Sequence, residues 1–171
     1  DPMNATTSVL ESLQHLREQA VHVDVIIGNA HPCAECVQDQ ASTFMSSTVH
    51  IQVPPSTVAN LLVRADIAIG AGGSSALERL CVGVPSIICE VAENQRSTVR
   101  SLSDARLALP YRLGFDSAAH LVSLVNRLLD DELLRTDIQV RGQRLVDGNG
   151  ARRVAATVVD MTVGNTREDR L

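Results

Sequence analysis

The residue types best suited to chemistry in this sequence lie in one short stretch. Three glycines, Gly70, Gly72 and Gly73, come directly after an apolar run, and Ser74 and Ser75 follow them. Glycine lets the backbone turn sharply and approach a ligand closely, and the free N–H groups and positive dipole end of a helix favour an anion. The pattern favours a phosphate bound at this turn. The same residues are also typical of a tight turn that binds nothing.

One carboxylate is placed to act beside this turn. Glu78 lies four residues after Ser74, so on a helix it faces the same side as the turn. A carboxylate there can accept two hydroxyl hydrogen bonds, such as those of a ribose, although a solvated helix residue beside Arg79 is the commoner role of such a side chain. The glycine spacing is not G-x-G-x-x-G, which disfavours a nicotinamide cofactor.

The other reactive residues are less organised. His31, Cys33 and Cys36 resemble half of a zinc site, but the second half is absent nearby, and the segment after Pro32 is predicted to begin a helix instead. The serines after Gly73 do not match the G-x-S-x-G pattern of a nucleophile elbow. The sequence therefore predicts no metal site and no catalytic residue.

The composition argues against several functions. All 15 basic residues are Arg, so the chain has no lysine for a Schiff base or for a Walker-type phosphate site. Aromatic residues make up 2% and the net charge is −5, which argues against nucleic-acid binding. The sequence shows no membrane span, no signal-peptide layout and too few cysteines for a disulfide scaffold, so we predict a cytoplasmic location.

Strand-like and helix-like stretches alternate through the first hundred residues. This alternation predicts an α/β fold, a Rossmann-like parallel sheet flanked by helices. The predicted strands cover residues 21–27, 48–53, 66–70 and 85–89, with 106–110 as a weaker candidate. Predicted helices begin near Asn4 or Thr6 and near Ser74, and others cover residues 33–43, 56–65, 94–105, 116–129, 131–145 and 149–163. One domain is predicted over residues 1–163, followed by a flexible tail over 164–171.

A doubly wound sheet normally opens with a strand, whereas this chain opens with a turn-like Asp1-Pro2 and a helix. We therefore expect that a first strand and an amino-terminal domain are missing from this sequence.

A family resemblance becomes specific at the glycine-rich stretch. Residues 65–79, the run Gly83-Val84-Pro85-Ser86 and the run Glu93-Asn94-Gln95 resemble the donor-binding half of GT-B glycosyltransferases. They resemble still more closely the PseG-like UDP-sugar hydrolases of pseudaminic acid biosynthesis. Asp1-Pro2 with Asn4 is similar to the segment after that family's first strand, and residues 146–154 are similar to its carboxyl-terminal Asp-Gly-x-Gly-Ala segment. The resemblance implies a carboxyl-terminal GT-B domain.

The resemblance also implies a ligand, UDP, bound in the cleft. It places Gly72, Gly73, Ser74 and Ser75 at the diphosphate, in agreement with the helix-start argument, and Glu78 at the ribose hydroxyls.

Three further residues are implicated by the resemblance alone. Val53 falls near the uracil loop, and Asn94 and Gln95 fall where such proteins contact the sugar or the phosphates. This chain departs from the family in having Ala76-Leu77 where a Thr-Trp pair is common and Val58 where a Met is usual.

The activity that the resemblance implies is hydrolysis of a UDP-linked deoxy-diacetamido sugar, which releases UDP and the free sugar for nonulosonic acid biosynthesis. The family's histidine general base belongs to the amino-terminal domain, so we expect this chain alone to be inactive, and no cofactor is implied. One alternative is the donor-binding domain of a GT-B glycosyltransferase. Another is a non-catalytic nucleotide-sugar-binding module that serves the missing domain or a partner chain.

Overall fold

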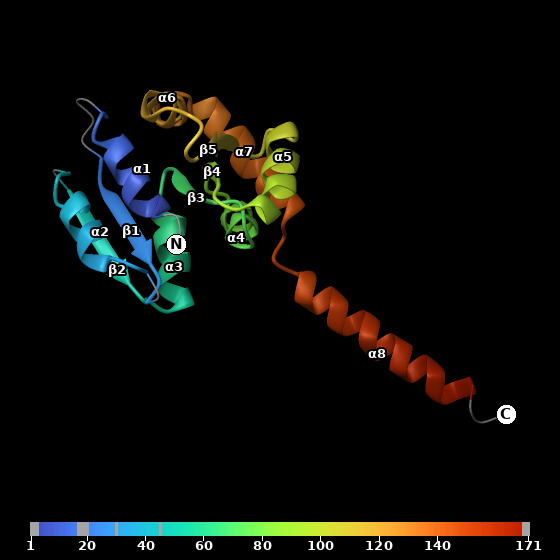
Figure 1. Ribbon diagram of the computed structural model, residues 1–171. Helices are drawn as coiled ribbons and strands as arrows, with labels where there is room; N and C mark the ends of the chain where they lie inside the picture. Colours follow the sequence, from blue (N-terminus) through green and yellow to red (C-terminus); the bar gives the residue numbers. More distant parts are fainter. Residues whose placement is uncertain (1–3, 17–20, 30, 45, 169–171) are drawn as a thin grey trace.

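The computed structural model describes residues 4–16, 21–29, 31–44 and 46–168. Strands and helices alternate as far as β5, and only helices follow it (Figure 1). In chain order the elements are α1 (Ala5–Leu13), β1 (Val23–Ile27), α2 (Ala34–Ala41), β2 (Ser47–Ile51), α3 (Pro55–Arg64), β3 (Ala68–Ala71), α4 (Ser75–Val82), β4 (Ser86–Glu90), the 3₁₀ turn η1 (Glu93–Gln95), α5 (Arg96–Asp104), β5 (Leu109–Arg112), α6 (Ala118–Asp130), α7 (Glu132–Leu145) and α8 (Gly150–Glu168).

The strands form two parallel sheets. β1 pairs with β2, and β4 pairs with β3 on one side and with β5 on the other. The predicted α/β class with parallel strands and flanking helices is confirmed. The single continuous sheet of the prediction is divided, because within the described residues no strand pairs with the second edge of β1 or of β3.

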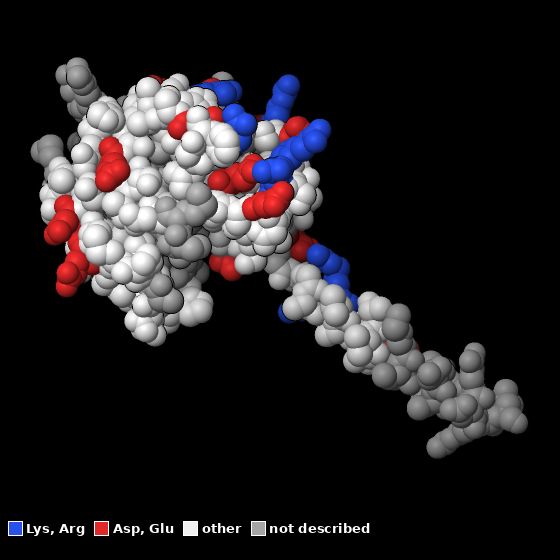
Figure 2. Space-filling model, in the orientation of Figure 1, with Lys and Arg blue, Asp and Glu red and all other residues white. Residues whose placement is uncertain are grey.

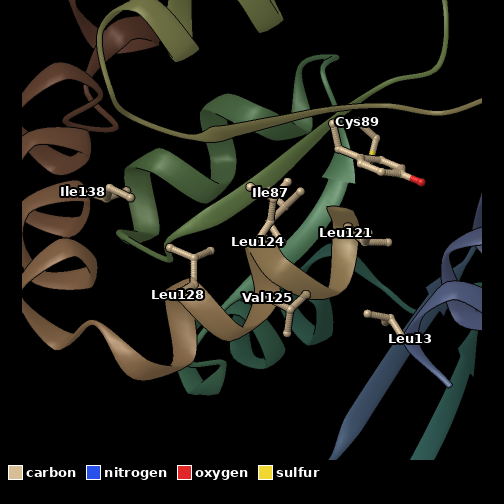
Figure 3. Packing of buried hydrophobic residues seen from close by; sticks show 9 residues of the cluster. Leu13, Ile87, Cys89, Leu121, Leu124, Val125, Leu128 and Ile138 are labelled. Atoms are coloured by element: carbon tan, nitrogen blue, oxygen red, sulfur yellow. The ribbon is translucent and has the colours of Figure 1, made fainter. Parts of the chain in front are cut away.

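β4 is the centre of the larger core. Its residues are buried from Ser86 to Cys89, as expected for a parallel strand covered by helices on both faces. Ile87 packs with Leu121 and Leu128 of α6, a cluster that Figure 3 shows from close by. Ile88 packs on the opposite face against α4 and α5.

α1 joins the two sheets. Leu10 belongs to the small core that covers β1 with α2, whereas Leu13, one turn later, belongs to the core around Ile87 of β4. Phe44 packs against both cores. The two sheets are therefore linked by side-chain packing across one helix face, although they share no backbone hydrogen bond among the described residues.

The element boundaries differ from the predictions by a few residues where turns intervene. The predicted helix over residues 94–105 begins as the 3₁₀ turn η1 and becomes α-helical only at Arg96. β5 begins at Leu109 because Arg106 takes a left-handed conformation, φ 55°, and Leu107 N–H returns to the Leu102 carbonyl. The prediction placed this strand at residues 106–110, too early in the chain.

Cys33 and Cys36 lie at the start of α2, where the sequence predicts a helix start. Cys33 is the N-cap residue, its sulfur accepts a hydrogen bond from the Cys36 N–H at 3.2 Å, and a disulfide joins the two residues. The sequence predicted the helix start but not the disulfide.

The last helix leaves the rest of the domain, as Figure 1 shows, and continues to Glu168, beyond the start of the predicted tail. Its Val154 and Val158 are exposed. Within the described residues, no helix combines the length and the apolar content that crossing a membrane requires.

The turn before α8 is organised by Asp147. Its carboxylate accepts hydrogen bonds from Arg153 Nη1 at 2.6 Å and from the Asn149 N–H at 3.0 Å. The Arg153 hydrogen bond, followed by that of Asn149, lowers the pKa of Asp147 from 3.8 to about 2. A carboxylate with a lowered pKa stabilises the folded state above pH 3.8, and this contribution is lost as the pH falls through about 2.

We predict that Arg153→Met raises the pKa of Asp147 toward 3.8, because it removes the largest of these interactions. An NMR titration of the Asp147 carboxyl carbon measures this directly. Arg152→Met is the matched control and leaves the pKa of Asp147 unchanged. If the Asp147 carboxyl of the wild-type protein titrates near pH 3.8, the ion pair with Arg153 is contradicted.

Candidate functional site

The glycine-rich turn lies where β3 ends and α4 begins, at the carboxyl edge of the larger sheet. The Gly72 N–H donates to the Cys89 carbonyl of β4 at 3.0 Å and also approaches Gln95 Oε1 at 3.2 Å. Gln95 Oε1 accepts the Val91 N–H as well, at 3.4 Å. One side-chain amide therefore ties the turn after β3 to the loop after β4.

The next three backbone amides, the N–H groups of Gly73, Ser74 and Ser75, have no protein acceptor among the described residues. The carbonyls of Gly73 and Ser74 accept the N–H groups of Ala76 and Leu77. Ser74 caps α4 without a side-chain hydrogen bond, and both serines are exposed. The structure thus presents three successive donors at the positive end of a helix, the arrangement that binds anions.

Gly72 is required by packing. A Cβ atom at this position would lie 2.5 Å from Val99 Cγ2 of α5 and 3.4 Å from Gln95 Cβ. The Gly72 N–H group already has protein acceptors. Gly72 therefore serves the site by its lack of a side chain, which lets α5 pack closely against the turn. The predicted contact of Gly72 with a diphosphate remains a prediction.

Arg79 is the residue at this site that sequence reasoning missed. It lies one turn into α4, only 6% exposed, and its guanidinium donates to the Ala71 carbonyl at 2.7 Å and to Ser75 Oγ at 3.2 Å. The guanidinium fills the space over Gly70, where a Cβ atom would lie 2.7 Å from Nη1. The signal was available in the sequence as an arginine four residues after Ser75 on the apolar face of α4.

The positive charge of Arg79 has no buried counterion. Among the described residues it forms no ion pair with a carboxylate, and its Nε atom is buried without a hydrogen-bond partner. Burial lowers the pKa of Arg79, which Cys89 and Glu78 partly offset. Burial also raises the pKa of the nearby Cys89 thiol to about 11, so that thiol is neutral at pH 7. A buried cation without an anion favours the binding of an anion from outside.

The remaining predicted residues lie at different distances from the turn. Glu78 is exposed in the first turn of α4, and Asn94 is exposed in η1. Gln95 is brought to Gly73, whose added Cβ would lie 3.8 Å from its Nε2 atom. Val53 follows β2, in the smaller sheet, where Gln52 takes a left-handed conformation with φ 49°. The structure therefore brings Gln95 to the turn, and it places Val53 in the loop that follows β2 of the other sheet.

A hollow of about 360 Å³ lies at the carboxyl ends of β4 and β5, and Val99, which packs against Gly72, is among the residues that line it. Its arginines are paired with acids: Arg96 contacts Glu90 at 3.0 Å, and Arg112 contacts Asp116 at 3.3 Å. Figure 2 shows basic and acidic side chains side by side on this part of the surface. Because these charges neutralise one another, Arg79 and the turn are the better anion site.

Metal-ligating side chains are not gathered at this edge. Within residues 4–16, 21–29, 31–44 and 46–168, no group of three or more His, Cys, Asp and Glu side chains is placed to hold a metal ion.

Comparison with known proteins gives the fold. No protein-family model matches the sequence. The spore coat polysaccharide biosynthesis protein SpsG of Bacillus subtilis strain 168 is 31% identical to this chain over 137 residues, which are 80% of this chain and 40% of SpsG. MurG of Acinetobacter baumannii superposes with a TM-score of 0.69 at 16% identity, over 93% of this chain and 48% of MurG.

Two further solved structures agree. The glycotransferase of kitacinnamycin has a TM-score of 0.69 at 20% identity, over 94% of this chain and 39% of its own. The spinosyn forosaminyltransferase SpnP has a TM-score of 0.58 at 17% identity, over 92% of this chain and 40% of its own. This chain has the α/β fold of one part of a GT-B glycosyltransferase. It spans less than half the length of SpsG and of each of these three structures.

We predict that Gly70→Ala lowers the free energy of unfolding by about 1–3 kcal/mol, because the new methyl group displaces the buried Arg79 guanidinium from its hydrogen bonds. Urea denaturation measures the loss. In an Arg79→Met background the added cost of Gly70→Ala is smaller, since the clash is gone.

Gly28→Ala is the matched control for this cycle. No atom lies within 4 Å of a Cβ atom added at Gly28, so its stability is expected to change little. If Gly70→Ala lowers the free energy of unfolding equally in the wild-type and Arg79→Met backgrounds, the contact between Gly70 and the Arg79 guanidinium is contradicted.

Proposed function

We propose that this domain binds the UDP half of a UDP-linked sugar at the amino end of α4. The observation that carries the proposal is the set of three successive amides without a protein acceptor, Gly73 to Ser75, with the buried cation of Arg79 behind them. A diphosphate supplies the negative charge and the acceptor oxygens that these groups lack. The Ser74 hydroxyl, exposed and not used as a helix cap, adds a further donor.

The nucleoside is assigned to the flanking residues. Glu78 lies one turn along α4 from the amides, and its exposed carboxylate is suited to accept the two ribose hydroxyls. We assign the uracil to backbone groups near Val53 and the sugar or the phosphates to Asn94 and Gln95. Gln95 Oε1 already holds Gly72 and Val91, so its Nε2 amide is the group left for a ligand.

For the whole protein we propose a nucleotide-sugar reaction in carbohydrate biosynthesis. This chain contributes the donor-binding half, and an amino-terminal domain or a partner chain contributes the second half of the cleft. Two reactions fit this arrangement. Hydrolysis of a UDP-linked deoxy-diacetamido sugar requires a base from the second half to activate water, whereas glycosyl transfer requires an acceptor hydroxyl there. The spore coat polysaccharide role named for SpsG and the transferases among the structural neighbours support the wider assignment.

We predict that the chain binds UDP in a calorimetric titration, more tightly than ADP or inorganic phosphate. Glu78→Ala weakens UDP binding by about tenfold to a hundredfold, the loss of one or two hydrogen bonds to a charged group, and leaves phosphate binding unchanged.

Glu132→Ala is the matched carboxylate control. Glu132 lines a hollow at the amino edge of the sheet, away from the turn, so its removal leaves UDP binding as it was. Equal binding of ADP and UDP, or no binding at all, contradicts a UDP site that is complete in this chain.

The reaction is decided by a second assay. We predict that this chain alone releases no UDP from a UDP-linked sugar, because the general base that the family resemblance implies belongs to the amino-terminal domain. With the whole protein, UDP release in water without any acceptor supports hydrolysis. Release that depends on an added acceptor supports transfer and rules out the hydrolase assignment.

A further inference from the structure

The C-x-x-C pair at the start of α2 is not part of the proposed nucleotide site. Cys33 and Cys36 follow β1 and open α2, which leads the chain to β2, the parallel neighbour of β1 (Figure 1). A C-x-x-C pair in such a β-α-β unit is typical of redox-active dithiols. The two cysteines are joined in a disulfide, whereas Cys81 and Cys89 are free thiols.

The backbone allows this disulfide to open and close without moving the chain. The Cα atoms of Cys33 and Cys36 lie 5.3 Å apart, because the two residues are about one helical turn apart at the start of α2. Val37, next to Cys36, and Ala41, one turn later, are buried in the core that covers β1. A disulfide that closes so short a loop also stabilises less than one that closes a long loop. We therefore expect the reduced chain to keep its fold.

The sulfur of Cys33 lies where a negative charge is stabilised. It accepts a hydrogen bond from the Cys36 N–H at 3.2 Å, and Cys33 is the N-cap residue of α2. Within the described residues, the N–H groups of Ala34 and Glu35 donate to no protein acceptor. Amide donors and the positive end of a helix dipole favour a thiolate over a thiol, and the exposed Glu35 carboxylate is screened by water. Cys33 is therefore the better leaving group when the disulfide breaks.

The sulfur of Cys36 belongs to the more accessible residue of the pair. Cys36 is exposed and Cys33 is half-buried. Hydrogen bonds in the preceding loop hold Cys33 in its N-cap position, because the Cys33 N–H donates to His31 Nδ1 at 3.2 Å and the His31 N–H donates to the Gly28 carbonyl at 3.1 Å. An incoming thiolate therefore reaches Cys36 more readily than Cys33.

We propose that Cys33 and Cys36 form a thiol–disulfide exchange site, which a dithiol reduces and a disulfide reoxidises. One thiolate of the dithiol attacks Cys36 Sγ and forms a new S–S bond there, while the bond between Cys33 and Cys36 breaks and leaves its electron pair on Cys33 Sγ. The second thiolate of the dithiol then attacks the dithiol sulfur bonded to Cys36, and the Cys36 sulfur leaves.

This exchange balances without another reactant. The protein disulfide gains two electrons, the dithiol is oxidised to a cyclic disulfide, and the two dithiol protons pass to the cysteine sulfurs or to water. The exchange does not involve the amides at α4, so its test is independent of UDP binding.

Peptide mass mapping after alkylation with iodoacetamide follows each cysteine of the chain. The protein is equilibrated, without denaturant and with a chelator, in mixtures of reduced and oxidised dithiothreitol. We expect Cys33 and Cys36 to become alkylated together as the mixture becomes more reducing, and to rejoin when it becomes more oxidising. The circular dichroism spectrum stays the same in both states.

Glutathione, a monothiol, reports which sulfur is attacked. A brief reaction of the oxidised chain, stopped with N-ethylmaleimide, is expected to give glutathione on Cys36 and N-ethylmaleimide on Cys33. Two matched variants compare the sulfurs directly. At pH 7 the Cys33 thiol of Cys36→Ser reacts with iodoacetamide at least about tenfold faster than the Cys36 thiol of Cys33→Ser. Serine is a good N-cap residue, so α2 keeps its start in the second variant.

The proposal is overturned by a pair that opens only in denaturant, that never rejoins, or that unfolds the chain when it opens. Glutathione on Cys33, or a Cys33 thiol no more reactive than that of Cys36, also overturns it. Zinc gives the remaining outcome. If the reduced chain binds one Zn²⁺ in equilibrium dialysis and the metal prevents reoxidation, the pair is a metal site instead.

Discussion

The contact between Arg79 of α4 and the end of β3 is the constraint on which the candidate site depends. A guanidinium that is 6% exposed fills the space over Gly70 and holds the Ala71 carbonyl, so β3 must end there and α4 must begin within a few residues. Gly72 then admits Val99 of α5 against the turn. The backbone is left with its next amides, through Ser75, pointing away from every protein acceptor in the described residues.

The electrostatics of the site follow from the same contact. The protein carries a net charge of −5, and five of its described arginines are paired with acids, as Arg96 is with Glu90. Arg79 differs because burial separates it from water and from carboxylates, while the neighbouring Cys89 thiol stays neutral at pH 7. The helix dipole of α4 adds partial positive charge at the same place. An acidic protein can therefore present a local anion site.

The larger architecture depends on side-chain packing where backbone pairing is missing. β4 is paired on both sides and buried on both faces, so it anchors the core of the larger sheet. β1 and β2 form a second sheet, which α1 links to the first through Leu10 and Leu13. Periodicity in the sequence predicted most of these elements, since apolar runs and amphipathic stretches are local properties. It could not reveal that two of the predicted strands would leave edges unpaired, because pairing is decided between segments distant in the chain.

The sequence by itself determined the α/β class, the place of the glycine-rich turn at the end of a strand, and the helix that begins at Ser74 or Ser75, because glycine, serine and apolar periodicity act over a few residues. Only the tertiary structure decided which of those groups are available. The Gly72 N–H donates to the Cys89 carbonyl, and Gln95 accepts a hydrogen bond from the same turn. Cys33 forms a disulfide with Cys36, and Arg79 is a buried cation. Each of these outcomes depends on which side chain or strand comes to lie beside another, and a one-dimensional pattern does not contain those distances.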